Sequence, residues 1–102
     1  MNYELYRETI IGIGVVFEAL SHPVRRQILI LLRTGPLSAG ALAEHFALTK
    51  PTLSVHFAKL REAELVTVER QGTSLIYHLN ASLLEESIAG LLSLKDRPDE
   101  KN

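Results

Sequence analysis

Residues 42–63, LAEHFALTKPTLSVHFAKLREA, constrain the fold more than any other part of the chain. This stretch predicts two helices joined by a sharp turn. Thr49 is the expected N-cap of the second helix, because its hydroxyl can accept a hydrogen bond from a free backbone N–H within the first turn. Pro51 follows, where its missing N–H costs nothing. The apolar residues then recur with the spacing of one buried helical face: Leu53, Phe57 and Leu60.

The opposite face of the second helix is small and polar. At about 100° per residue, the outward positions are Pro51, Thr52, Val55, Ala58, Lys59 and Glu62, with Lys50 at the helix start. In a DNA major groove, hydroxyls can read base edges, a valine methyl can contact thymine, and lysine can meet phosphate. The pattern therefore predicts a DNA-reading helix-turn-helix. The alternative is a solvated face in any small helical protein.

Length and composition indicate one folded domain. The chain has 102 residues, of which 46% are hydrophobic and 23% charged. We assign residues 1–95 to the domain and residues 96–102 to a flexible tail, because the tail is charged and has no apolar anchor. There is no cysteine, which excludes disulfides and thiol-based metal or redox sites. The apolar run over residues 10–20 lacks a basic leader and is too short to span a bilayer, so we expect a cytoplasmic protein.

Charge is unevenly distributed along the chain. Residues 21–80 carry seven Lys and Arg against four Asp and Glu, whereas residues 1–20 and 81–102 are both acidic. Contact with phosphate would therefore come from the middle of the chain. The ends are expected to face each other or another protein.

The first predicted helix, residues 3–20, is apolar on nearly every side from Ile10 onward. Such a helix is normally buried on several sides, and one short domain can hardly cover it. We therefore expect a second copy to cover it, together with the last predicted helix, residues 81–95. The expected dimer contacts are Ile10, Ile13, Phe17, Leu84, Ile88 and Leu91.

Cap signals divide the segment between these helices. Ser21, followed by Pro23, predicts the start of a second helix, and Ser38 predicts a short helix over residues 39–46. Arg25 and Arg26 lie early on the second helix. They could touch phosphate, or they could form a solvated pair or a salt bridge to an acid. Both readings stay open at this point.

After residue 63 the apolar period changes to two, which predicts strands. The strands are separated by Gln71, Gly72 and Thr73, a hairpin turn in which glycine is free to take a positive φ. A hairpin directly after a recognition-type helix is typical of a wing, which lies over the sugar-phosphate backbone or dips into the minor groove. The alternative is a plain hairpin with a solvated tip. Asn80 or Ser82 is the expected cap of the last helix.

The predicted order is four helices, two strands and a final helix, a mainly α fold with a small β-hairpin (α+β). With "ALSHPVRRQILILL", "LAEHFALTKPTLSVHFAKLREAELV" and "RQGTSLIYHL", it resembles the ArsR-type winged helix-turn-helix repressors over about residues 17–92. Thr49, Lys50, Pro51 and His56 resemble the SdpR autorepressor branch. The resemblance implies a homodimer that binds an inverted-repeat operator in double-stranded DNA and represses transcription, often of its own operon. It implies base-reading roles for Thr52, Ser54, Val55 and His56, and a wing role for Arg70, Gln71 and Gly72.

Many proteins of this type are metal sensors, and the sequence departs from their pattern. The position of the paired sensor cysteines reads Glu44, His45, Phe46, and the last helix has no histidine. The four histidines fall on four different predicted elements, so we expect neither a metal site nor a cofactor. For His56, groove contact is the preferred interpretation. His22, His45 and His78 are expected to be structural.

The resemblance also suggests how repression is relieved, and the sequence leaves alternative functions open. The SdpR-like branch suggests relief of repression by a membrane protein that sequesters the repressor, although no residue here indicates it. Alternatives are a winged helix used only for protein contact, or a metal- or ligand-responsive repressor. An enzyme is not expected, because the sequence has no phosphate loop, paired-carboxylate signal or clustered His, Asp and Glu. The expected DNA contacts are Lys50, Pro51, Thr52, Ser54, Val55, His56, Lys59, Arg70, Gln71 and Gly72.

Overall fold

A computed structural model describes residues 7–96, and its element order is that of a winged helix-turn-helix. The elements are α1 (Arg7–Leu20), α2 (Pro23–Leu31), the 3-10 helix η2 (Leu32–Thr34), β1 (Leu37–Ser38), α3 (Ala39–Ala43), α4 (Lys50–Glu62), β2 (Val66–Gln71), β3 (Ser74–Leu79), α5 (Ala81–Leu92) and the 3-10 helix η3 (Ser93–Lys95). The mainly helical fold predicted from the sequence is confirmed. The predicted start of the first helix, residues 3–6, and the tail beyond residue 96 lie outside the described residues.

The sheet has three antiparallel strands in the order β1-β3-β2, whereas the sequence predicted a two-stranded hairpin. The third strand arises because Leu37 and Ser38 pair with Tyr77 and Ile76 of β3. Ser38 also caps α3, since its Oγ accepts a hydrogen bond from the backbone N–H of Ala41 at 3.0 Å. Gly72, in the turn between β2 and β3, has φ +63°, the positive φ for which glycine was expected.

Helix α3 is shorter than predicted. It ends at Ala43 rather than Phe46, because the chain then tightens into i→i−3 hydrogen bonds. The N–H of His45 donates to Leu42 O and the N–H of Phe46 donates to Ala43 O, both at 3.1 Å. This tight turn separates the two helices of the helix-turn-helix.

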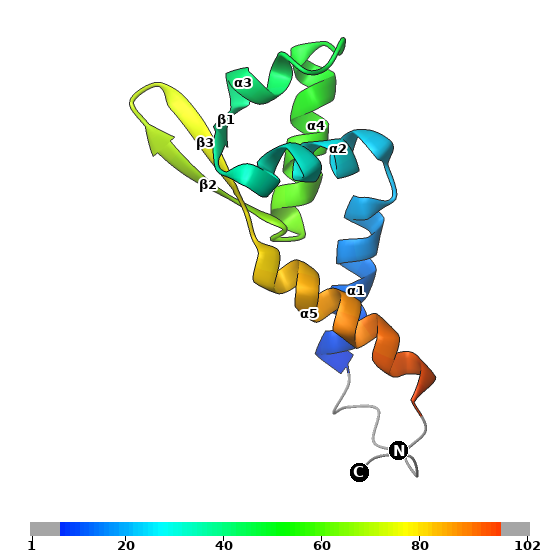
Figure 1. The fold of residues 1–102 in the computed structure, drawn as a ribbon. Coiled ribbons are helices and arrows are strands. Elements are labelled where there is room, and N and C mark those ends of the chain that lie inside the picture. The colour runs from blue at the N-terminus through cyan, green and yellow to red at the C-terminus, as the bar shows by residue number, and fades with distance from the viewer. Residues whose placement is uncertain (1–6, 97–102) are drawn as a thin grey trace.

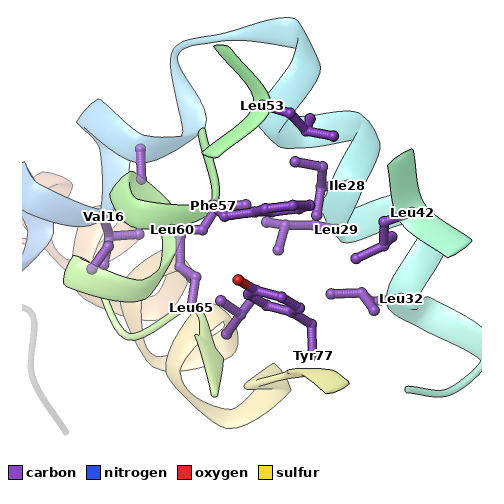
Figure 2. Close-up of a cluster of buried hydrophobic side chains, with 13 residues drawn as sticks. Val16, Ile28, Leu29, Leu32, Leu42, Leu53, Phe57, Leu60, Leu65 and Tyr77 are labelled. Atoms are coloured by element: carbon purple, nitrogen blue, oxygen red, sulfur yellow. The ribbon is translucent and has the colours of Figure 1, made fainter. Parts of the chain in front are cut away.

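The core lies between the helices and the sheet, on the predicted face of α4. Leu53, Phe57 and Leu60 are all buried, and Leu60 is fully so. The Phe57 ring stacks on Tyr77 of β3, with the ring centroids 4.7 Å apart. Figure 2 shows this pair surrounded by side chains from the other elements, including Val16, Ile28, Leu29, Leu32, Leu42 and Leu65. The core therefore joins α4 to α1, α2, α3 and the sheet.

Asn80 links the end of α4 to the start of α5. After α4, Glu64 takes a left-handed φ of +62°, and the N–H of Leu65 donates to Leu60 O at 3.0 Å, as in a Schellman cap. The Asn80 amide donates to Glu64 O and its backbone N–H donates to Leu65 O, both at 2.9 Å. Its Oδ1 accepts from the N–H of Leu83 at 3.3 Å, so Asn80, rather than Ser82, caps α5.

Helices α1 and α5 pack along each other and form an arm that extends away from the sheet (Figure 1). The wing and the N-terminal end of α4 lie in the opposite half of the molecule. Within residues 7–96, every helix falls short of the length and apolar character needed to cross a bilayer. The fold thus separates a helical arm from the predicted DNA-reading elements.

Removing the Leu60 side chain tests the core. We expect Leu60→Ala to lower the free energy of unfolding by about 2–5 kcal/mol, because it leaves a cavity at a fully buried site. Val55→Ala is the matched control on the same helix; its side chain is 56% exposed, so we expect a change within about 0.5 kcal/mol. Urea denaturation measures both, and equal midpoints for the two variants would contradict this packing.

Candidate nucleic-acid interface

The N-terminal half of α4 presents the small polar surface that the sequence predicted. Thr49 caps the helix: its Oγ1 accepts from the N–H of Thr52 at 3.4 Å. The two hydroxyls also meet at 2.9 Å, which holds the Thr52 side chain at the surface. The structure exposes five of the predicted contact residues here: Lys50, Pro51, Thr52, Ser54 and Val55. Hydroxyl, methyl and ammonium groups are thus all exposed along the first turns of α4.

The wing presents a second exposed polar surface. Arg70, Gln71 and Gly72 are all exposed at the tip of the β2–β3 hairpin. Behind the tip, His78 Nε2 and Glu69 Oε1 lie 3.0 Å apart across the two strands. The tip therefore exposes the Arg70 guanidinium and the Gln71 amide, and the His78–Glu69 pair lies farther back along the strands.

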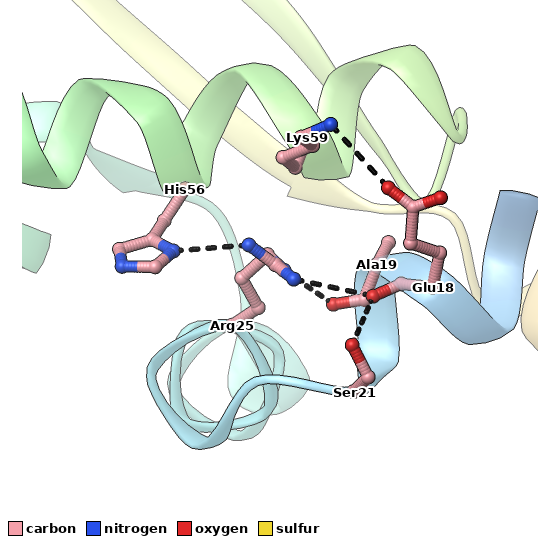
Figure 3. Close-up of polar contacts among 6 residues, drawn as sticks. All are labelled: Glu18, Ala19, Ser21, Arg25, His56 and Lys59. Atoms are coloured by element: carbon pink, nitrogen blue, oxygen red, sulfur yellow. Dashed lines mark hydrogen bonds and ion pairs between the residues drawn. The ribbon is translucent and has the colours of Figure 1, made fainter.

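His56 does not belong to the exposed face, and its predicted groove contact is wrong in this structure. Its side chain is only 8% exposed, and its Nδ1 lies 3.2 Å from Arg25 Nη1 (Figure 3). The ring also packs against His22, with centroids 4.3 Å apart. The physical reason is position: at about 100° per residue, His56 lies only about 60° from Leu53 around the helix.

Arg25 and Arg26 donate hydrogen bonds to backbone carbonyls at the end of α1. Arg25 Nε donates to Ala19 O at 2.6 Å, and Arg25 Nη2 donates to Glu18 O at 3.2 Å. Arg26 Nη1 donates to Leu20 O at 2.8 Å. The last carbonyls of a helix lack intrahelical donors and favour cations nearby. Arg25 is therefore a C-terminal cap of α1, rather than a phosphate contact or a partner of an acidic side chain. The sequence signal for this role is a pair of arginines just after the predicted end of the first helix.

His22, rather than the predicted Ser21, caps α2. Its backbone is extended, at φ −109° and ψ 131°, and its Nδ1 accepts from the N–H of Val24 at 3.1 Å. The Ser21 hydroxyl donates instead to Glu18 O at 2.6 Å. Serine thus completes α1, and the cap of α2 moves one residue along to the position directly before Pro23.

Lys59 connects the predicted DNA face to α1. Its Nζ lies 3.3 Å from Glu18 Oε1, and the two side chains are 43% and 66% exposed. An ion pair this exposed contributes at most about 1 kcal/mol. Lys59 therefore remains available to a competing anion.

The surroundings of His56 lower its pKa. Burial is the largest cause, and the nearby His22 and Arg25 add to it. The neutral ring is the form that leaves Nδ1 free to accept from Arg25.

Among residues 7–96, no three His, Asp or Glu side chains gather so that they could hold a metal ion.

Comparison with known proteins agrees with this arrangement. A family model described as a helix-turn-helix domain matches residues 20–69. The chain is 42% identical over 84 residues to the transcriptional repressor SdpR of Bacillus subtilis, covering 82% of this chain and 93% of that protein. It is 41% identical over 73 residues to an arsenical resistance operon repressor of Staphylococcus xylosus, covering 72% and 70%. A solved ArsR-like transcriptional regulator from Rhodococcus superposes with a TM-score of 0.77 at 25% identity, covering 85% and 82%.

The lowered pKa of His56 predicts pH-dependent stability. The unfolded chain binds a proton at the ordinary histidine pKa of about 6.5, whereas the folded chain binds it only at lower pH. The contribution of neutral His56 to the free energy of unfolding is therefore fully present above about pH 6.5. It is lost as the pH drops toward the pKa of the folded chain. We expect His56→Gln to lose less stability than the wild type between about pH 7.5 and 5.5. Urea midpoints at both values measure this; equal losses would contradict it.

Proposed function

The chain belongs to the ArsR family of winged helix-turn-helix transcriptional repressors, and from this premise we propose that it binds an inverted-repeat operator as a homodimer and represses its own transcription. Its relatives SdpR and the arsenical resistance operon repressor are transcriptional repressors, not enzymes, as the sequence predicted. The observation that carries the proposal is the exposed face of α4. That face is held outward by the buried stripe on the other side of the same helix.

Base reading is assigned to the exposed residues of this face. Thr52 and Ser54 offer hydroxyls that can donate to or accept from base edges, and Val55 offers methyl groups to thymine. Lys50 and Lys59 contact phosphate, and Pro51 fixes the first turn of the helix. Arg70, Gln71 and Gly72 contact the backbone or the minor groove beside the helix. His56 is left out, because it is buried.

Dimerisation is assigned to the arm formed by α1 and α5. Large apolar side chains are exposed along it: Val15, Ile88, Leu91, Leu92 and Leu94. Ile13, Phe17 and Leu84 are half-buried within the protomer, and the side chain of Ile10 lies outside the described part of the chain. Several large exposed apolar side chains on two helices that pack together support a protein interface. Two copies joined through the arm would present two α4 helices about one DNA turn, roughly 34–36 Å, apart.

Three finer features belong to the same proposal. Repression acts on the chain's own operon, the protein works in the cytoplasm, and a membrane protein relieves repression by sequestering it. They are what the resemblance of the sequence motifs to the SdpR branch implies. The 42% identity to the transcriptional repressor SdpR supports the repressor role on which they build. The exposed leucines of α5 are a surface that such a partner could cover in place of the second copy.

Substitutions on α4 separate base reading from phosphate contact. We expect Thr52→Ala to change the preferred operator and cost about 1–3 kcal/mol on the best wild-type site, because a base-edge contact is lost. We expect Lys50→Ala to weaken all sequences alike and to reduce the salt slope of binding by about 1. Fluorescence anisotropy on an operator selected from genomic fragments, titrated over salt, measures both.

The scrambled operator is the control in that experiment. The proposal fails if the wild-type protein binds the operator and the scrambled duplex with equal affinity. If Thr52→Ala lowers the affinity for every sequence by the same factor, Thr52 does not read bases. The rest of the proposed function would still stand.

A charge on the arm tests the dimer. We expect Leu91→Asp to give a folded monomer that binds the operator at least about tenfold more weakly, because it buries an unpaired carboxylate in the proposed interface. Leu91 is 42% exposed in the protomer, so the fold should persist. Ser82→Asp is the control, since it adds the same charge at an exposed position in the first turn of α5. Sedimentation velocity reports the mass, and a Leu91→Asp dimer would contradict the interface.

A further inference from the structure

Three helices meet at a polar junction centred on the Arg25 guanidinium (Figure 3). From α2, Arg25 reaches Glu18 O and Ala19 O at the end of α1 and His56 Nδ1 on α4. Beside it, Lys59 of α4 pairs with the Glu18 carboxylate. Arg25 is 8% exposed, so neither DNA nor solvent anions reach most of the group. The junction thus joins the arm to the recognition helix from inside the molecule.

The chemistry of this junction is directional. A guanidinium is a rigid planar fork with five donors, so it can satisfy several acceptors only in one arrangement. The buried stripe of α4 already prevents that helix from turning about its own axis. Apolar packing is non-directional, however, so it resists tilting of one helix against another less strictly than hydrogen bonds do. The bonds to α1 and to α4 therefore oppose tilting of one helix against the other. Burial strengthens them, because the surroundings are less polarisable than water.

We propose that Arg25, acting through His56, is a positioning residue that fixes the recognition helix α4 relative to the dimer arm and so sets the half-site spacing that the repressor accepts. The inference rests on the proposed dimeric repressor. In such a dimer the separation of the two α4 helices depends on how each α4 is held against its own α1. The separation of the two α4 helices determines the distance between the two half-sites that the dimer can bind along the duplex.

The state of His56 agrees with this role. Its Nδ1 accepts from Arg25 only when it carries no proton, and its lowered pKa keeps the ring neutral near pH 7. The groups that face it are His22, the N-cap of α2, and Arg25 on α2, with the Glu18–Lys59 pair on the far side of Arg25. The link between α2 and α4 is therefore intact at neutral pH.

The test measures affinity across a set of operators in which the two half-sites are moved apart or together by single base pairs. We expect the wild-type protein to prefer one spacing by at least about tenfold over its neighbours. We expect Arg25→Lys to reduce that preference to less than about threefold, because a single ammonium cannot hold both α1 and His56. His56→Leu, which removes the acceptor, should do the same.

Two matched controls separate positioning from general stability. Arg26→Lys alters the neighbouring arginine, which binds Leu20 O and makes no hydrogen bond to α4 among the described residues, and should keep the wild-type preference. His56→Gln offers a neutral amide oxygen to Arg25 and should also keep it. Affinities are measured at a temperature at which circular dichroism shows each variant folded. If Arg25→Lys does not fold, His56→Leu decides the question.

The outcomes distinguish this inference from the function on which it rests. A loss of affinity in Arg25→Lys that is equal at every spacing would overturn the inference, because Arg25 would then affect binding without setting the separation of the two α4 helices. A wild-type protein that recognises the operator without any preference for spacing would overturn it as well. A wild-type protein that does not distinguish operator from scrambled DNA would overturn the proposed function itself.

Discussion

The burial of one side of α4 is the constraint on which the rest of the structure depends. Leu53, Phe57 and Leu60 enter the core together, and Phe57 stacks on Tyr77 of the sheet. Each such side chain contributes about 1.5–3 kcal/mol when removed from water, so the helix cannot turn about its axis without losing several of these contributions. The outward face follows from this. Thr52, Ser54 and Val55 are exposed because the opposite side is occupied.

Polar contacts add what the apolar core cannot provide. The core fixes how closely the helices pack, whereas Arg25 and Asn80 bind named backbone atoms of other elements. Arg25 completes the end of α1 and reaches α4. Asn80 begins α5 and holds the end of α4. The recognition helix is therefore tied to the arm at two points, in its middle through His56 and just past its C-terminal end through Glu64 O and Leu65 O.

Features that local rules govern could be predicted from the sequence. The cap at Thr49, the buried stripe of α4 and the positive φ of Gly72 each depend on residues within a few positions. Strand β1 was missed, because two residues are too short to show a period and their partner is Tyr77, far along the chain. The capping role of Arg25 was missed for a similar reason: its partners lie on other elements. The roles of the α4 and wing residues at DNA stay predictions.

His56 shows how two sequence arguments can conflict. The resemblance to a family favoured contact with DNA. The angle around the helix, which the sequence interpretation of His56 did not use, puts this residue near Leu53 and Leu60. The angle agrees with the structure, in which the ring is 8% exposed. Its neighbour Val55 differs by one position and is 56% exposed. Facing direction on a helix is therefore decided more reliably by the buried stripe than by residue type.

The contact between Glu18 and Lys59 has a consequence for discrimination among anions. The Glu18 carboxylate lies 3.3 Å from the Lys59 ammonium, the group that we propose contacts phosphate. In the proposed complex, docking would exchange one anionic ligand of Lys59 for another. Lys59 would then add less net attraction than Lys50, which has no ion-pair partner within residues 7–96. By competing for Lys59, Glu18 would weaken binding to DNA of any sequence. The selectivity of the protein would then depend more on the hydroxyl-bearing residues of α4.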